Sequence, residues 1–163
     1  MKVGIVSDTH RNTKRPPLAI ETFREAGIRR VIHLGDVTNG KVAELFAPFD
    51  AWFVYGNADR DLEELRSTVD SLFGSGRLAE YHQLEWEGVK IAAVHGHTDR
   101  LGELVNSGHF NIVLHGHTHK RRDEMVARTR VINPGALGGI KWQSRSYAIL
   151  DLPSGALEYI ELE

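Results

Sequence analysis

The chain has 163 residues, 41% hydrophobic and 26% charged, which predicts one folded domain over residues 1–163 and excludes a disordered chain. The net charge is −2 and the densest basic run is Lys120-Arg121-Arg122, so there is no strong nucleic-acid signal. The sequence has no cysteine, which excludes disulfides and thiolate ligands and leaves only nitrogen and oxygen donors for a metal.

The first half of the chain alternates predicted strands and helices. Short β-branched or aromatic runs that end in polar residues predict strands at residues 2–7, 30–34 and 51–55. Apolar residues at helical spacing and start signals such as consecutive prolines predict helices at residues 16–27, 39–48 and 59–73. Three strand–helix repeats are typical of a layered α/β fold with a parallel core.

The second half of the chain is richer in short strands. Residues 81–87 and 89–94 flank Gly88 and predict a β-hairpin. A helix is predicted at residues 99–107 and a strand at residues 111–115. Further short strands are predicted near residues 124–132, 145–151 and 156–162, and the turn signals Asn133-Pro134-Gly135 and Pro153-Ser154-Gly155 separate them.

Residues able to bind a metal follow several of the predicted strands. Six of the nine histidines fall within residues 95–119, far more than random placement would give. Ligands of open α/β sheets bind beyond the carboxyl ends of the strands. We therefore expect one site built from the polar residues at five strand ends, which are Asp8, His10, Asp36, Asn57, His95, His117 and His119.

This donor set predicts a site for two divalent metal ions. Two carboxylates, four imidazoles and one amide suit manganese, nickel, iron or zinc better than calcium or magnesium, and manganese is favoured. Seven ligands exceed what one ion takes from protein while keeping an open position, so two ions sharing a carboxylate are expected. Taken singly, Asp8, Asp36 and Asn57 would each fit a turn or a helix cap.

Five ordered segments resemble the motifs of the calcineurin-like metallophosphoesterases. These segments are Asp8-Thr9-His10, Gly35-Asp36, Gly56-Asn57-Ala58-Asp59, His95-Gly96-His97 and Gly116-His117-Thr118-His119. Together with Asn133-Pro134-Gly135, they are most similar to the small single-domain bacterial and archaeal phosphodiesterase branch. The resemblance implies an α/β fold with four layers, an α/β/β/α sandwich of two central mixed sheets with the metal site at the C-terminal strand ends.

The resemblance also implies how the ligands divide between two metals. One metal is implied to be held by Asp8, His10, Asp36 and His119. The other is implied to be held by Asp36, Asn57, His95 and His117. Asp36 would bridge them, and a hydroxide shared by the metals would attack the phosphorus of a phosphate ester.

Ala58 departs from one branch of this family. The phosphoprotein phosphatases have a histidine after the Gly-Asn pair, which donates a proton to the leaving group; here Ala58 stands at that position. His97 is the candidate catalytic donor, with solvent as the alternative, and Asn57 is expected to contact phosphate. Phosphodiesters with good leaving groups are therefore the favoured substrates.

Three residues beside the ligands are candidates for substrate binding, namely Arg11, Asp59 and Arg60. His33 and His115 lie within strands and are expected to support their neighbours. The expected partner is a phosphate-ester substrate, and a homo-oligomer is an open alternative to a monomer. The apolar run at the N-terminus is too short for a signal peptide and no stretch reaches a membrane span, so a cytoplasmic protein without a membrane partner is expected.

Other functions compete with a phosphodiesterase. A phosphomonoesterase or a nuclease would use the same site. A non-catalytic protein-binding scaffold of this fold occurs in the retromer complex, where the metal ligands are eroded. All seven ligand positions here carry competent donors, which favours an enzyme. A dinucleotide-binding module is disfavoured because no G-x-G-x-x-G follows the first strand.

Overall fold

Parallel strands form the centre of the first sheet. The computed structural model describes residues 1–139 and 143–162. The strands of this sheet are β1 (Lys2–Val6), β2 (Arg30–His33), β3 (Asp50–Val54), β4 (Leu78–Ala79), β10 (Arg145–Asp151) and β11 (Leu157–Leu162). They lie in the order β11-β10-β1-β2-β3-β4. Strands β1 to β4 are mutually parallel, whereas β10 pairs antiparallel with β1 and β11. The predicted parallel core is confirmed.

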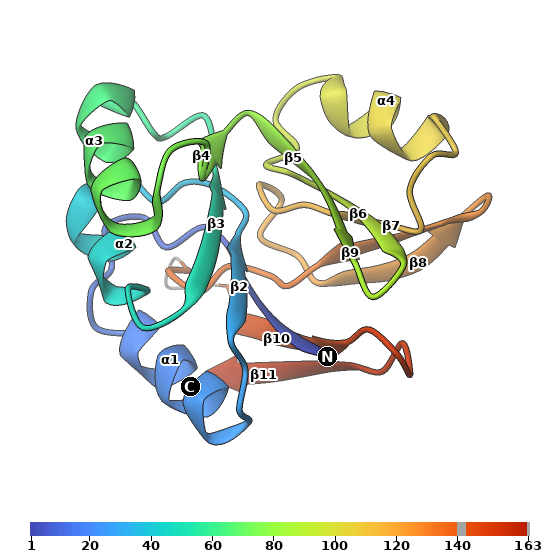
Figure 1. Cartoon of the computed structure of the whole chain (residues 1–163), viewed down its shortest axis with the longest axis horizontal. Coiled ribbons are helices and arrows are strands. Elements are labelled where there is room, and N and C mark those ends of the chain that lie inside the picture. The colour runs from blue at the N-terminus through green and yellow to red at the C-terminus, as the bar shows by residue number, and fades with distance from the viewer. Residues whose placement is uncertain (140–142, 163) are drawn as a thin grey trace.

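Three helices cover the outer face of this sheet (Figure 1). They are α1 (Pro16–Glu25), α2 (Gly40–Leu45) and α3 (Leu62–Phe73). Helix α1 begins at a proline, whose fixed φ suits a first turn, and α3 begins after Asp61, whose side chain accepts from Glu64 N. The apolar sides of these helices, including Phe23, Val42 and Leu65, form a buried cluster against the sheet.

The second sheet mixes a hairpin with parallel strands. Its strands are β5 (Tyr81–Trp86), β6 (Val89–Val94), β7 (Ile112–Leu114), β8 (Arg122–Val126) and β9 (Thr129–Asn133). They lie in the order β5-β6-β7-β9-β8, with β6, β7 and β9 parallel. The predicted hairpin around Gly88 is confirmed: Glu87 and Gly88 both have positive φ, as a two-residue turn requires. Helix α4 (Arg100–Asn106) covers the outer face.

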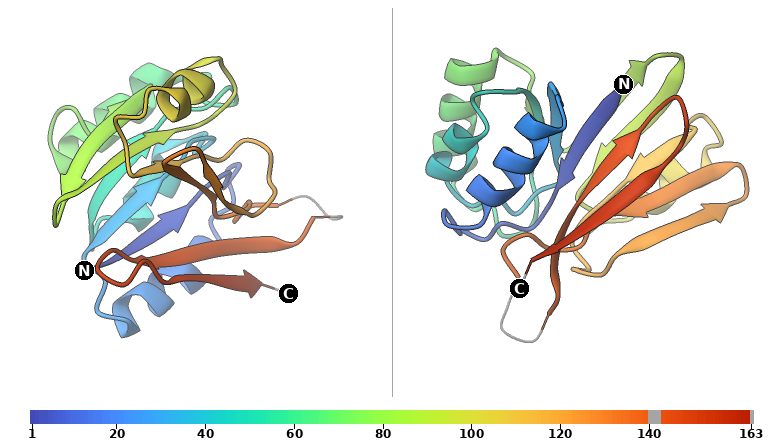
Figure 2. Two further views of the ribbon diagram at one scale, coloured as in Figure 1. Left: turned by 90° about the vertical axis from the view of Figure 1, so that its right-hand side faces the viewer. Right: turned by 90° about the horizontal axis from the view of Figure 1, so that it is seen from below.

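The two sheets pack face to face and create the central core. Ile5 and Ile32 of the first sheet belong to one buried cluster with Ile91, Leu114 and Ile132 of the second. Each such side chain contributes about 1.5–3 kcal/mol on burial. Figure 2 shows the resulting succession of layers, with α1 to α3 on one outer side and α4 on the other. The α/β/β/α sandwich is confirmed.

Several predicted bounds change at element ends. The helix expected from residue 59 begins at Leu62, because Asp59 and Asp61 accept backbone hydrogen bonds that belong to a loop and a helix cap. The helix expected over residues 39–48 ends at Leu45 in a turn. Strand β4 was not predicted, and its two residues pair with Phe53 and Val54.

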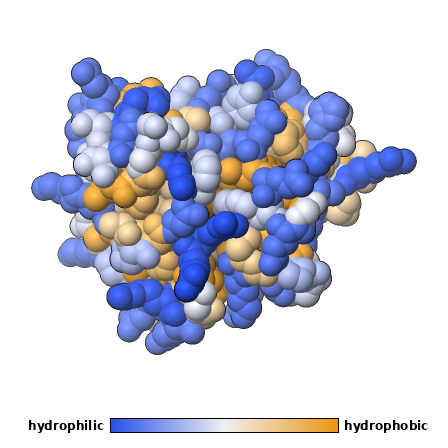
Figure 3. Space-filling view, viewed as in Figure 1, coloured by the Kyte–Doolittle hydropathy of each residue, from blue (hydrophilic) through white to orange (hydrophobic). Residues whose placement is uncertain are grey.

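Hydrophilic side chains cover most of the face drawn in Figure 3, with smaller apolar areas between them. Leu18, Leu72 and Met125 are the exposed large hydrophobic residues of the described chain. Within the described ranges, none of the helices combines the length and the apolar character needed to cross a bilayer.

Candidate metal centre

All seven predicted ligands meet where β1, β2, β3, β6 and β7 end. Backbone hydrogen bonds join the loops that carry them: Asp8 N donates to Gly35 O, and Gly116 N donates to His95 O. The first bond joins two loops of the first sheet and the second joins two loops of the second sheet, whereas His117 N, which donates to Asp8 Oδ2, links the two sheets at their carboxyl ends, where ligands of α/β sheets bind. The predicted convergence is therefore present in the structure.

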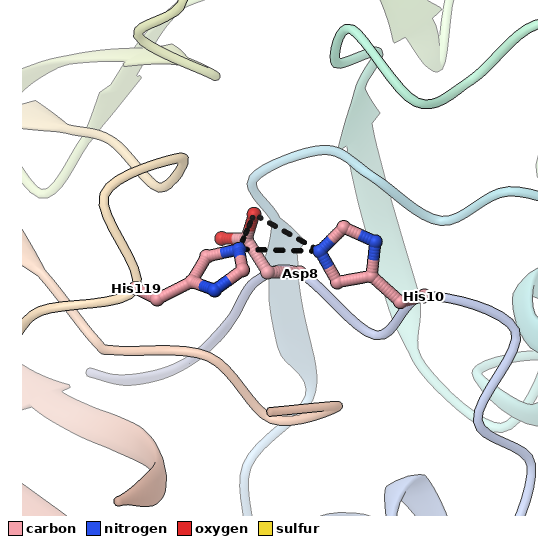
Figure 4. A group of neighbouring side chains, drawn as sticks. All are labelled: Asp8, His10 and His119. Atoms are coloured by element: carbon pink, nitrogen blue, oxygen red, sulfur yellow. Dashed lines mark hydrogen bonds and ion pairs between the residues drawn. The ribbon is translucent and has the colours of Figure 1, made fainter. Parts of the chain in front are cut away.

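The first group of ligands contains Asp8, His10 and His119 (Figure 4). Asp8 Oδ1 lies 3.1 Å from His119 Nε2 and 3.8 Å from His10 Nε2. The two imidazole nitrogens are 3.2 Å apart. Three donor atoms thus face one another: Asp8 and His10 supply two of them from the loop after β1, and His119 supplies the third from the loop after β7.

The second group lies around His95. Its Nε2 is 3.4 Å from Asp36 Oδ2 and 3.2 Å from Asn57 Oδ1. The ring centroid of His117 lies 5.1 Å from that of His95. The amide oxygen of Asn57 therefore faces the same point as a carboxylate and an imidazole, as expected for a mixed nitrogen and oxygen site.

Asp36 lies between the two groups. Its Oδ2 is 3.6 Å from His10 Nε2 in the first group and 3.4 Å from His95 Nε2 in the second. Its Oδ1 accepts a hydrogen bond from Ala58 N at 2.8 Å, which fixes the carboxylate plane. One carboxylate oxygen is thus held where it faces both sets of donors.

The burial of Asp8 shows that the centre suits a cation. Asp8 Oδ2 accepts from Ser7 Oγ and His117 N, but Oδ1 is buried without any hydrogen-bond partner in the described structure. A buried carboxylate oxygen without a partner is strongly unfavourable unless a cation or a proton compensates it. The residues present therefore fit a metal ion.

The tautomers of two histidines also suit metal binding. His95 Nδ1 lies 2.7 Å from the carbonyl oxygen of Leu34, so Nδ1 carries the proton and donates it. His119 Nδ1 lies 2.7 Å from Gln143 Oε1 and donates likewise. In both rings the Nε2 lone pair is left facing the carboxylates, which is the arrangement that supporting hydrogen bonds give metal-binding histidines.

Five of the seven ligands have left-handed backbone. The φ angles of Asp8, His10, Asp36, His117 and His119 lie between 46° and 65°. Such angles are uncommon outside glycine and cluster at functional sites, where the surrounding structure holds them. The loops thus hold these side chains in place at a conformational cost.

Two glycines allow the close packing of the centre. A Cβ at Gly56 would lie 2.2 Å from Asp36 Oδ1, and a Cβ at Gly116 would lie 1.9 Å from Ser7 Oγ. Neither contact is compatible with a side chain at these positions. Both glycines are required by the approach of the backbone to the carboxylates.

The charges of the centre favour added positive charge. Burial disfavours the ionised form of Asp36, but hydrogen bonding to His95 and nearby positive charge lower its pKa to about 2. Burial opposes protonation of His95, yet Asp36 and Asp8 raise its pKa, and the neighbouring carboxylate of Asp8 raises the pKa of His119. Without a metal, the carboxylates therefore favour protonated imidazoles, and a bound metal would displace these protons.

The predicted substrate-binding residues separate into two kinds. Arg11 and Arg60 are exposed and line a pocket beside His10. Asp59 is instead buried: Oδ2 accepts from the backbone N–H groups of Asp36 and Gly56, and Oδ1 accepts from that of Thr38. The structure thus corrects the placement of Asp59 at the substrate mouth, because both of its oxygens serve the loops.

His97 lies at the rim of the centre. Its side chain is exposed, and its ring centroid is 5.3 Å from that of His95 and 6.2 Å from that of His117. Burial, together with the neighbouring His95 and His117, lowers the pKa of His97. The residue is close enough to the centre to meet a substrate there.

Sequence reasoning missed two supporting residues. Gln143 orients His119, and Asn133 holds the loop that carries His117 and His119. Asn133 Nδ2 donates to Gly116 O and to Thr118 Oγ1. The sequence marks Asn133 as part of a turn signal and of a segment that resembles the family, but gives it no role at the site, and Gln143 lies in no motif.

Two further histidines support the loops, as expected. His33 Nδ1 accepts from Gly35 N, so Nε2 donates to Thr9 Oγ1, whose hydroxyl donates to Asp36 O. Burial lowers the pKa of His33 to about 3 and that of His115 to about 4, which keeps both rings neutral. His115 Nδ1 donates to Gly116 O.

Comparisons with known proteins agree with this geometry. The profile of the calcineurin-like phosphoesterase superfamily domain matches residues 1–155. A phosphodiesterase of Methanocaldococcus jannaschii is 32% identical over the full length of both chains, and the phosphodiesterase YfcE of Escherichia coli is 25% identical over 93% of this chain and 88% of its own.

Solved structures share the fold. An archaeal phosphodiesterase superposes with a TM-score of 0.92 at 31% identity, covering 99% of this chain and 100% of its own. Vps29 of Entamoeba histolytica, solved with zinc, has a TM-score of 0.73 at 19% identity, covering 99% of this chain and 98% of its own. The second likeness concerns the fold alone. The match along nearly the whole sequence, with the motif residues gathered at one edge of both sheets, shows that the chain belongs to the calcineurin-like phosphoesterase superfamily.

Proposed function

We propose that this protein is a metal-dependent phosphodiesterase. The observation that carries the proposal is the buried Asp8 Oδ1, which has no hydrogen-bond partner and faces the Nε2 atoms of His10 and His119. A carboxylate and two imidazoles arranged in this way provide a site for a divalent cation. The phosphodiesterases among its relatives support the choice of substrate class.

We propose two divalent ions, with manganese favoured and nickel, iron or zinc as alternatives. Asp8, His10, Asp36 and His119 would hold the first ion. Asp36, Asn57, His95 and His117 would hold the second, with Asp36 Oδ2 as the shared ligand. When bound, two such ions supply an activated water and neutralise charge on the phosphoryl oxygens.

The protein's own residues position the ester. Asn57 has an amide nitrogen available to donate to a phosphoryl oxygen, since its Oδ1 faces His95. Arg11 and Arg60 extend the positive surface beyond the ligands. Asp59 contributes by holding the loops of Asp36 and Thr38 through its three backbone hydrogen bonds. We propose His97 as the proton donor to the leaving group.

Ala58 supports a preference for diesters over phosphoserine-like monoesters. A methyl group here cannot donate a proton, and the pocket that Ala58 lines is open. A leaving group that needs little protonation, such as an aryl oxide, suits this arrangement. Phosphomonoesterase or nuclease activity at the same centre is the alternative, and the assay below separates the two ester classes.

The test is reconstitution of the metal-free protein. Chelator-treated protein is supplied in turn with manganese, nickel, iron, zinc or magnesium, and its bound metal is measured by mass spectrometry. Hydrolysis of bis(p-nitrophenyl) phosphate and of p-nitrophenyl phosphate is then followed. We expect two metals per chain and faster turnover of the diester. Absence of turnover with every metal, in folded protein, would support the scaffold function instead.

Two matched variants test the shared ligand. Asp36→Ala is expected to lose both metals and nearly all turnover, because its Oδ2 faces both groups of donors. Asp123→Asn changes a carboxylate on β8 that pairs with Arg130, and should leave metal content and turnover unchanged. Full metal content and near-normal activity in Asp36→Ala would refute the bridging role.

A further inference from the structure

A pocket of about 240 Å³ opens beside the metal centre. It is lined by His10, Arg11, Thr38, Ala58 and Arg60. At about 30 Å³ per water molecule, this volume corresponds to about eight waters, which is room for a phosphate group and a short linker. One lining residue, His10, is itself a proposed metal ligand, so a substrate bound at the centre can extend into the pocket.

The two arginines of the pocket lack acidic partners. Within residues 1–139 and 143–162, no ion pair or hydrogen bond engages the guanidinium of Arg11 or Arg60. Asp59 is adjacent in sequence, but both of its oxygens accept backbone N–H groups. Six other arginines of the described residues do pair with a carboxylate, namely Arg30, Arg77, Arg100, Arg121, Arg122 and Arg130. Two free guanidinium groups in one pocket form a place for an anion.

The backbone holds the walls of this pocket in unusual conformations. Arg11 has a φ of 62° and Thr38 a φ of 74°, which is rare for a β-branched residue. Asn12 N donates to Thr9 O at 2.9 Å and closes the turn that carries Arg11. Asp59 Oδ1 accepts from Thr38 N at 2.5 Å. The backbone around Arg11 and Thr38 is thus held by hydrogen bonds within the loops.

We propose that Arg11 and Arg60 bind a second phosphate of the substrate, so that the preferred substrates are phosphodiesters carrying an additional phosphate group. This inference rests on the proposed function of the metal centre, which would bind the scissile phosphate. Guanidinium groups form paired hydrogen bonds with phosphate oxygens, and two of them match a dianion. Because both arginines are exposed, we expect a total preference of about tenfold that weakens with salt.

Two matched probes test the second-phosphate site. Thymidine 5′-(p-nitrophenyl phosphate) and its 3′-phosphorylated form share the same scissile bond and leaving group and differ only in the second phosphate. With manganese-loaded protein, the 3′-phosphorylated probe should have a KM about tenfold lower. Calorimetry should show the same preference for thymidine 3′,5′-bisphosphate over thymidine 5′-monophosphate.

Variants connect this preference to the arginines. In Arg11→Gln/Arg60→Gln the ratio between the two probes, and between the two nucleotides, should fall to near one. Arg128→Gln removes another exposed arginine, from the turn between β8 and β9, and should keep the wild-type ratios. Circular dichroism and thermal unfolding check that the double variant is folded.

The outcomes distinguish the second-phosphate site from the proposed function. Turnover of both probes with a ratio near one in the wild type, or an unchanged ratio in the double variant, would overturn the second-phosphate site alone. Binding preference for the bisphosphate that is lost in the double variant, without turnover of either probe, would support that site and overturn the diesterase function.

Discussion

Replacing Asn133 by alanine should weaken both the fold and the metal centre. The side chain is 0% exposed: Nδ2 donates to Gly116 O at 2.8 Å and to Thr118 Oγ1 at 3.1 Å and lies 3.4 Å from His115 Nδ1, and Oδ1 accepts from Gly135 N at 2.8 Å. Gly116 O keeps a second donor, His115 Nδ1, but Gly135 N loses its partner in a buried position. These bonds hold a loop whose two histidines have left-handed backbone.

The expected loss follows from these contacts. Two neutral hydrogen bonds contribute about 0.5–1.5 kcal/mol each, and an unsatisfied buried N–H costs about 1–3 kcal/mol. The free energy of unfolding should therefore fall by about 2–6 kcal/mol, a large part of the stability of a typical domain. Loss of a hydrogen bond that supports metal ligands typically weakens metal affinity by about 10–100-fold, and we expect that here.

The measurements are urea unfolding of the metal-free protein and titration with manganese. Asn111→Ala is the matched control, because its exposed Asn111 Oδ1 accepts one hydrogen bond from Lys90 N, far from the ligands in the second sheet. This control should lose less than about 1 kcal/mol and bind manganese normally. Asn133→Ala with control-like stability and affinity would show that the loop is held by something else.

Three further predictions follow from the same geometry. Gly56→Ala should displace the Asp36 carboxylate and abolish metal binding in calorimetry. The control Gly102→Ala lies inside α4 with open space around it, and it should leave the free energy of unfolding unchanged or raise it by up to about 1 kcal/mol. Metal binding by Gly56→Ala would refute the predicted clash. In metal-free protein, His117→Gly should be more stable to urea than His117→Ala by about 1 kcal/mol, because φ at this position is 65° and only glycine adopts it without strain; equal stabilities would argue against strain. Burial lowers the pKa of His33 to about 3, below the value near 6.5 of an unfolded chain, so the stability it contributes is complete above pH 6.5 and is lost as the pH falls toward 3. His33→Gln should therefore reduce the slope of unfolding free energy against pH, between pH 4.5 and 6, by about 1.4 kcal/mol per unit, and an unchanged slope would mean that the ring is protonated in the fold.

Strands and turns that are marked by a few consecutive residues could be predicted from the sequence. The strands before Asp8, Asp36 and Asn57 are each an apolar run followed by a polar residue. Because these strands pair in parallel, the polar residues lie at the same edge of the sheet. Gly88 likewise marked its hairpin. Strand β4 has only two residues, too few for any periodicity, and exists because β3 offers it an open edge.

Supporting residues were harder to predict because their partners are distant in sequence. Asn133 lies 17 residues from Gly116, and Gln143 lies 24 residues from His119. Nothing in a linear pattern links such pairs before the sheets are assembled. For Asp59 the position in the sequence was informative but the side-chain direction was not. Its nearness to Asn57 predicts that it lies close to the site, but does not predict that its carboxylate accepts backbone hydrogen bonds.

The left-handed backbone of the ligand loops has a consequence for the evolution of this fold. At Asp8, His10, Asp36, His117 and His119 the side chain proposed to bind metal is not the residue that the backbone prefers. Strain of this kind typically costs about 1 kcal/mol or more at each position. Replacing a ligand by glycine would therefore end metal binding and relax the loop in a single step. On the proposed function, a copy of the gene that is released from selection for hydrolysis would gain stability as it lost these ligands.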